Sequence, residues 1–156
     1  MGYELHAVIA EGALLRGAVR EMAAARLAPL GQGLALMPMT DELFDAVTDG
    51  GPVSPLGFWR LPGGFDTHLA NWSATGPIAY VEAEYFGGVG EQRAAVWDGG
   101  TLALGPLHVG EGQDVPAAGS PVSRALRRLG AVAGTAEDEF AAVGLGRHRD
   151  PEAWLA

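Results

Sequence analysis

The chain of 156 residues contains no cysteine and no lysine, and all ten of its basic residues are arginine. The lack of cysteine excludes disulfides, thiolate metal sites, iron–sulfur clusters and cysteine nucleophiles. No apolar run approaches the roughly 20 residues of a membrane-spanning helix. Residues 1–6 also lack the basic and apolar regions of a signal peptide, so we expect a cytoplasmic protein that does not bind membranes.

Sequence motifs of known catalytic and cofactor sites are also missing. The histidines are scattered and form no His-x-His or His-Glu-x-x-His pair, and no Gly-x-Ser-x-Gly motif occurs. Residues 87–90 are rich in glycine, but a strand pattern follows them where a phosphate-binding loop needs the N-terminus of a helix. We therefore expect no cofactor and no resident metal.

Negative charge dominates the composition. The formal net charge is −9, which would repel the phosphate backbone of nucleic acids and favours a basic protein partner through electrostatic steering. Hydrophobic residues make up 48% of the chain and charged residues 19%, as in globular proteins. A chain of this length fits one domain, which we expect to span residues 1–156.

The hydrophobic patterns mix strands and helices without a regular βαβ alternation. Period-two patterns predict strands, and apolar residues at helical spacing predict helices that begin after the capping residues Thr40 and Ser120. The expected fold is α+β, a mainly antiparallel sheet of about five or six strands with helices packed on one face. The strands are expected over 3–10, 26–30, 34–39, 78–86, 93–97 and 101–104.

A β-ribbon in the middle of the chain places two carboxylates together. Alternation along its first strand puts Glu82 and Glu84 on one face, about 7 Å apart. With the turn centred on residues 88–89, Gln92 or Arg93 would lie opposite this pair. Close carboxylates serve as acid–base pairs and hard-cation sites, but a solvated face with cross-strand ion pairs and an acidic patch for a partner remain open.

The segment 53–64 is apolar and aromatic but is broken by proline and glycine. It either folds over the core as a lid or stays exposed as a contact surface. Trp59 and Arg60 are neighbours within it, and tryptophan and arginine are enriched among the residues that dominate protein interfaces.

Three stretches, residues 80–92, 120–130 and 138–154, resemble a group of small uncharacterised proteins of high-GC bacteria. Some similar proteins are immunity proteins that act beside secreted polymorphic toxins. The resemblance implies a small acidic α+β protein that binds a toxin. It supplies no catalytic residues that could be transferred to this chain.

These observations predict a non-catalytic protein-binding domain, for instance a cytoplasmic immunity protein that neutralises a basic toxin. Glu82, Glu84 and Glu91 would supply negative charge to the interface. Trp59 and Arg60 would anchor the partner.

Two alternatives stay open. In the first, the chain is a small enzyme or ligand-binding domain that uses His68, Glu82 and Glu84 in a cleft under the segment 53–64. In the second, that apolar segment joins two copies of the chain in a homodimer.

Overall fold

The computed structural model describes residues 2–51 and 55–155. They form an antiparallel six-stranded sheet with the order β2-β3-β1-β4-β5-β6. This confirms the predicted α+β class. The strands are β1 (Gly2–Glu11), β2 (Ala28–Pro29), β3 (Leu34–Pro38), β4 (Ile78–Phe86), β5 (Val89–Asp98) and β6 (Thr101–Val109).

Within the described residues, five short α-helices and four 3-10 turns lie between the strands or follow the last of them. Two predicted caps are confirmed: the Thr40 hydroxyl accepts a hydrogen bond from the Leu43 N–H at 3.1 Å, and the Ser120 hydroxyl accepts one from the Ser123 N–H at 3.3 Å. No helix in the described residues is long and apolar enough to cross a bilayer. The helices are α1 (Gly12–Val19), α2 (Asp41–Val47), α3 (Phe65–Trp72), α4 (Pro121–Arg128) and α5 (Glu139–Val143), and the turns are η1 (Pro55–Gly57), η2 (Ser73–Thr75), η3 (Leu145–Arg147) and η4 (Glu152–Leu155).

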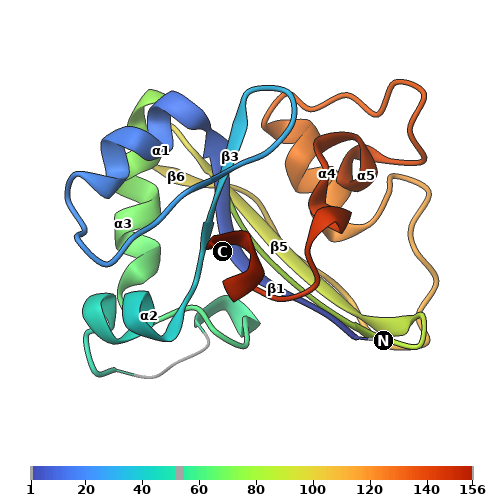
Figure 1. Ribbon diagram of the computed structural model, residues 1–156, viewed down its shortest axis with the longest axis horizontal. Coiled ribbons are helices and arrows are strands. Elements are labelled where there is room, and N and C mark those ends of the chain that lie inside the picture. Colours follow the sequence, from blue (N-terminus) through green and yellow to red (C-terminus); the bar gives the residue numbers. More distant parts are fainter. Residues whose placement is uncertain (1, 52–54, 156) are drawn as a thin grey trace.

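The helices cover both faces of the sheet, which corrects the prediction that they pack on one. Figure 1 shows α1, α2 and α3 on one side and α4 and α5 on the other. The reason lies in β1, where every residue from 5 to 10 is buried. Its alternate residues enter two different cores, as in strands that are covered on both sides. Leu5, Ala7 and Ile9 pack towards α4 and α5, and Val8 and Ala10 pack towards α1–α3.

The β4–β5 hairpin closes one residue earlier than the sequence predicted. Phe86 pairs with Val89, and the turn consists of Gly87 and Gly88, with φ values of 61° and 82°. Two central residues with positive φ are the requirement of a type I′ turn, which glycine meets without strain. The predicted centre of the turn at residues 88–89 was therefore wrong. The resulting change of register places Glu91 opposite Glu84.

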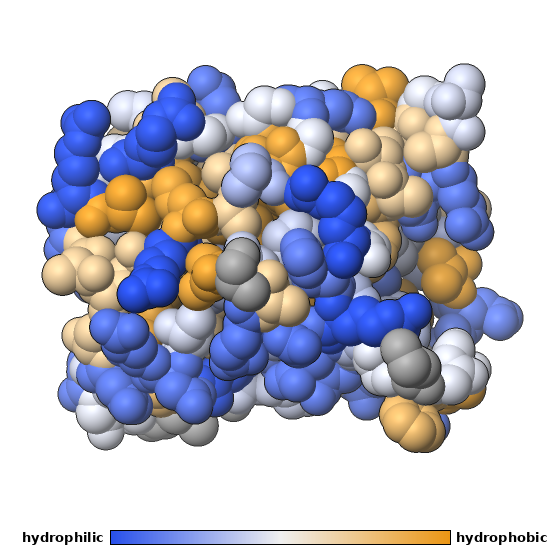
Figure 2. Space-filling view, viewed as in Figure 1, coloured by the Kyte–Doolittle hydropathy of each residue, from blue (hydrophilic) through white to orange (hydrophobic). Residues whose placement is uncertain are grey.

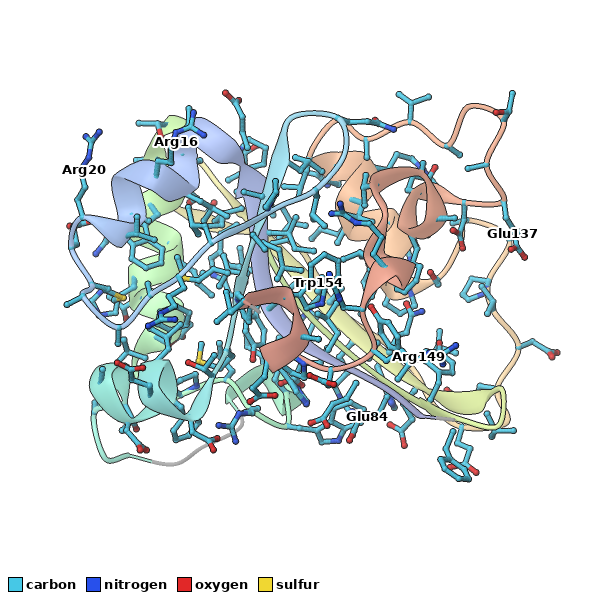
Figure 3. All side chains as sticks on the ribbon, viewed as in Figure 1. Arg16, Arg20, Glu84, Glu137, Arg149 and Trp154 are labelled. Carbon is cyan, nitrogen blue, oxygen red and sulfur yellow. The ribbon has the colours of Figure 1, made fainter. Side chains whose placement is uncertain are left out.

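On the face that carries α1–α3, chemistry changes from row to row along the sheet. Of the five cross-strand rows, the first two are apolar and buried beneath the helices. The third is charged and mostly covered, and the fourth and fifth lie near the β4–β5 hairpin. Hydrophilic side chains cover much of the lower half of the molecule in Figure 2, and Figure 3 shows Glu84 far from Arg16 of α1 and from Arg20, which follows that helix. The cross-strand rows are Ala10–Ile78–Trp97, Val8–Tyr80–Ala95, His6–Glu82–Arg93, Glu4–Glu84–Glu91 and Gly2–Phe86–Val89.

Both faces of the sheet should contribute to stability. Leu69 of α3 and Leu126 of α4 are fully buried in different cores. We expect Leu69→Ala and Leu126→Ala each to lower the free energy of unfolding by about 2–5 kcal/mol in urea titrations, because each leaves a cavity. Leu102→Ala, at a side chain that is 40% exposed, is the control and should change it by less than about 0.5 kcal/mol. A neutral effect at either buried leucine would contradict the two-core architecture.

Candidate functional site

A buried carboxylate holds the segment that follows η1 against the sheet. Glu82 of β4 is fully buried; its Oε1 accepts a hydrogen bond from the Trp59 N–H at 2.6 Å and its Oε2 one from the Arg60 N–H at 2.7 Å. The Tyr80 hydroxyl donates to the Arg60 carbonyl oxygen at 2.8 Å. Such charge-assisted bonds are among the strongest hydrogen bonds in proteins. Phe58 and Leu61 are fully buried here, so residues 58–61 fold onto the core as the lid alternative predicted, while residues 53 and 54 lie outside the described part of the chain.

His6 of β1 lies between two carboxylates. Its Nδ1 is 3.3 Å from Glu82 Oε2, and its Nε2 is 3.0 Å from Glu4 Oε1. The Nδ1 contact is a close charge contact that is poorly aligned for a hydrogen bond. Burial by itself would lower the pKa of His6, but the attraction of the two carboxylates, Glu82 first and then Glu4, outweighs burial and raises it.

An aromatic ring covers the row that contains His6 and Glu82. The Trp59 ring lies edge-on to His6, with 6.2 Å between the ring centroids. The Arg93 guanidinium lies 4.1 Å from the centroid of the same ring, which is the geometry of a cation–π interaction. This row is therefore closed by the residues 58–61 and is held by polar contacts within the protein.

The next row consists of three glutamates. Glu4, Glu84 and Glu91 lie directly opposite one another on β1, β4 and β5. Like charges directly opposite one another destabilise a sheet. Arg93 and His108 approach Glu91 at 3.3 and 3.0 Å. No hydrogen bond or ion pair from any other described residue reaches the Glu84 carboxylate. The row thus concentrates negative charge, which His6 offsets at Glu4 and Arg93 and His108 offset at Glu91, while no described residue offsets it at Glu84.

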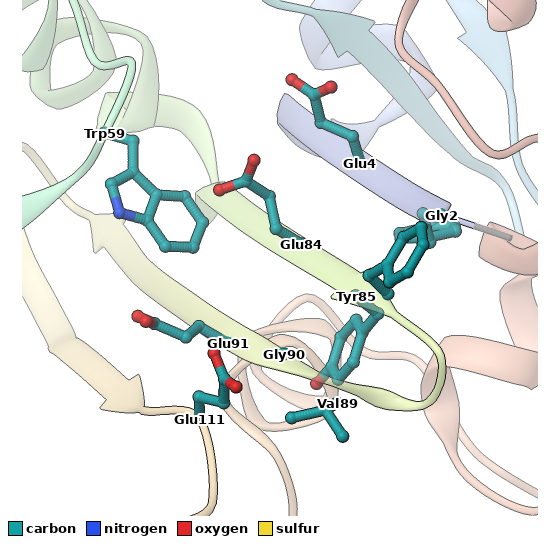
Figure 4. Close-up of a pocket in the computed structure, with 11 residues that line it drawn as sticks. Gly2, Glu4, Trp59, Glu84, Tyr85, Val89, Gly90, Glu91 and Glu111 are labelled. Carbon is teal, nitrogen blue, oxygen red and sulfur yellow. The ribbon is translucent and has the colours of Figure 1, made fainter.

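This row forms the floor of a hollow of about 420 Å³. Figure 4 shows Glu4, Glu84 and Glu91 on adjacent strands, Trp59 beside Glu84, and Glu111 on the chain that follows β6. At the hairpin end, Phe86 and Val89 are 77% and 50% exposed. We call this hollow the acidic groove, and its lining includes the side chains of Glu4, Trp59, Glu84, Phe86, Val89, Glu91 and Glu111.

The structure brings together some of the residues that the sequence singled out for a partner. Glu84, Glu91 and Trp59 line the acidic groove. Glu82 does not lie on a surface, because the backbone of residues 59 and 60 covers its carboxylate. Arg60 turns towards α2, which removes it from the groove.

Three contacts hold the Arg60 side chain at α2. Its Nη2 pairs with the Asp41 carboxylate, its Nε donates to the Met39 carbonyl oxygen at 3.3 Å, and its guanidinium lies 5.1 Å from the centroid of the Phe44 ring. Its side chain therefore fastens the lid to a helix, and the contact of Arg60 with a partner stays a prediction.

The alternative ligand site is not assembled as predicted. His68 is exposed on α3 and lines a different hollow, together with Met22, Glu42 and other residues. Within the described residues, no contact joins it to Glu82 or Glu84. The helical spacing of α3 turns His68 away from the sheet, because Leu69 and Phe65 occupy its buried face.

Sequence reasoning missed Glu4, His6 and Glu111 as members of the site. Glu4 and His6 alternate on one face of the first predicted strand, so their shared direction was visible in the sequence. Their position beside Glu84 depends on the pairing of β1 with β4, which joins segments about half a chain apart. No local pattern reports such a pairing.

Comparison with known proteins finds no matching family model, no matching curated protein and no matching solved structure. The resemblance to immunity proteins therefore stays a prediction.

The hydrogen bonds of Glu82 should be needed to hold the lid. We expect Glu82→Gln to lower the free energy of unfolding by about 1–3 kcal/mol, because the amide turns a donor towards one of two buried N–H groups. Amide hydrogen exchange at Trp59 and Arg60 should accelerate. Unchanged exchange at both amides would show that the carboxylate does not secure this segment.

Glu84, the exposed one of the two glutamates on β4, should affect the free energy of unfolding in the opposite direction. Glu84→Gln removes repulsion from Glu4 and Glu91, so we expect the free energy of unfolding to rise by about 0.2–1 kcal/mol at low ionic strength. The gain should shrink as salt is added, since screening weakens the repulsion between exposed charges. Denaturant titrations at 20 mM and 500 mM NaCl would measure both values. A loss of stability at low salt would mean that Glu84 supports the fold.

Proposed function

We propose that this protein is a non-catalytic binding domain that receives a basic partner protein in the acidic groove. The observation that carries the proposal is the row of Glu4, Glu84 and Glu91, three carboxylates directly opposite one another on adjacent strands. Evolution retains a locally unfavourable arrangement most readily where function requires it. A partner that inserts arginine or lysine side chains would convert this repulsion into attraction.

The rim of the groove supports a protein as the partner. Phe86 and Val89 expose apolar surface beside the carboxylates, and Trp59 forms a wall near Glu84. Aromatic residues are enriched at the centres of protein interfaces, where they fill pockets in the partner. The groove therefore combines a charged floor with apolar contacts, which suits a segment that carries both basic and hydrophobic side chains.

The net charge of −9 would accelerate the encounter with such a partner. The finer proposal is that the partner is a basic toxin and that this chain is its cytoplasmic immunity protein. Electrostatic steering suits that role, because an immunity protein must capture its toxin before damage occurs. The resemblance noted in the sequence supports this choice of partner.

Charge reversal in the groove tests the proposal. The immobilised protein and its Glu84→Arg and Glu137→Arg variants would be exposed to lysate of the producing cells, and bound proteins identified by mass spectrometry. Glu137 is an exposed acid on another side of the molecule, so it provides the same change in net charge outside the groove (Figure 3). We expect a basic protein that the wild type and Glu137→Arg retain and Glu84→Arg loses.

The recovered protein would then be purified and its dissociation constant measured. We expect Glu84→Arg to weaken binding at least tenfold and Glu137→Arg to change it less than twofold. Equal retention by all three proteins would contradict a role for the groove. If the basic protein arrests growth when expressed alone, rescue by the wild type and not by Glu84→Arg would support the immunity assignment.

A further inference from the structure

One corner of the acidic groove holds three side chains whose donor atoms converge. Glu4 and His6 come from β1, and Glu84 comes from β4. The Nε2 or Nδ1 of His6 and one carboxylate oxygen from each glutamate all lie within 4.8 Å of one another. Zinc binds imidazole nitrogen and carboxylate oxygen at about 2.0–2.2 Å, so two ligands of one ion lie at most about 4.4 Å apart. A small rotation of the exposed Glu84 side chain would close the remaining gap.

The surroundings of His6 provide a second and independent indication. His6 is only 4% exposed, yet its Nε2 is directed towards the carboxylate of Glu4 at the groove. Its Nδ1 has no well-aligned hydrogen bond and lies 3.3 Å from Glu82 Oε2. In metal sites, the second nitrogen of a ligating histidine commonly donates to a carboxylate, which orients the ring and makes the first nitrogen a better ligand.

Glu82 is well suited to this supporting position. It is fully buried, and the N–H groups of Trp59 and Arg60 hold its two oxygens in place. It therefore cannot turn into the groove to become a ligand itself without releasing the lid. Its fixed carboxylate would keep the His6 ring oriented with Nε2 towards Glu4.

We propose that Glu4, His6 and Glu84 bind a divalent transition-metal ion of the class that imidazole ligands suit, such as Zn²⁺. One imidazole and two carboxylates suit these ions, whereas Mg²⁺ and Ca²⁺ are bound almost entirely by oxygen. The ion would neutralise the two glutamates that face each other across β1 and β4. Solvent would complete its coordination, because Glu4 and Glu84 are exposed at the groove. This site does not depend on the proposed protein partner.

Titration with Zn²⁺ alone tests the site. After treatment with a chelator and its removal, isothermal titration calorimetry of the wild type should show one saturable site. Glu84→Gln should weaken it at least tenfold, and the variant should fold normally because no other described residue bonds to the Glu84 carboxylate and the main-chain pairing of Glu84 is unchanged. Glu111→Gln removes a carboxylate of the same groove that is outside the cluster, and should change the affinity less than twofold.

The ¹⁵N resonances of His6 give a separate measurement. Zn²⁺ should shift the ¹⁵N resonance of Nε2 strongly and leave Nδ1 protonated. Millimolar Mg²⁺ should not reproduce this shift. The proposal would be overturned if Glu84→Gln and Glu111→Gln lost the same affinity for Zn²⁺, or if Zn²⁺ bound without a change at His6 Nε2. Either result would show that Zn²⁺ is attracted diffusely to the acidic side chains. Either result leaves the binding of a basic protein to be judged by its own experiment.

Discussion

The hydrogen bonds between the Glu82 carboxylate and the backbone of residues 59 and 60 are the interaction on which the site depends. They draw the lid across one row of the sheet and bring Trp59 over His6 and Arg93. A buried charge is tolerated there because backbone donors and a neighbouring histidine compensate for its lost hydration. The lid ends at this row, so the next row of the same face stays open.

The β4–β5 hairpin decides what that open row contains. Its turn of two glycines sets the register that places Glu91 opposite Glu84. A Cβ on Gly90 would collide with the Glu84 carbonyl oxygen, so glycine is required beside the turn as well. Backbone geometry thus aligns the carboxylates in a row, although electrostatics alone would separate them. Rigid strands are a suitable support for such an arrangement, because they hold side chains in place against mutual repulsion.

The two proposals, a basic protein in the acidic groove and a metal ion at Glu4, His6 and Glu84, rest on the same electrostatic feature. Both begin from concentrated negative charge that the fold leaves uncompensated at Glu84. They differ in the partner that supplies positive charge: a basic side chain with apolar neighbours in one case, a small ion with a preference for nitrogen in the other. The exposed Phe86 and Val89 favour the first, and the buried His6 backed by Glu82 favours the second.

By itself, the sequence determined the antiparallel α+β class, the caps at Thr40 and Ser120, and the shared direction of Glu82 and Glu84. Each of these follows from local periodicity or from a residue's own hydrogen-bonding capacity. Only the tertiary structure decided that Glu82 is buried while Glu84 is exposed, that helices cover both faces, and that Glu4 and His6 join the site. Those outcomes depend on the pairing of β1 with β4 and on the path of the lid, contacts between distant segments that are selected by burial over the whole chain and leave no short-range pattern.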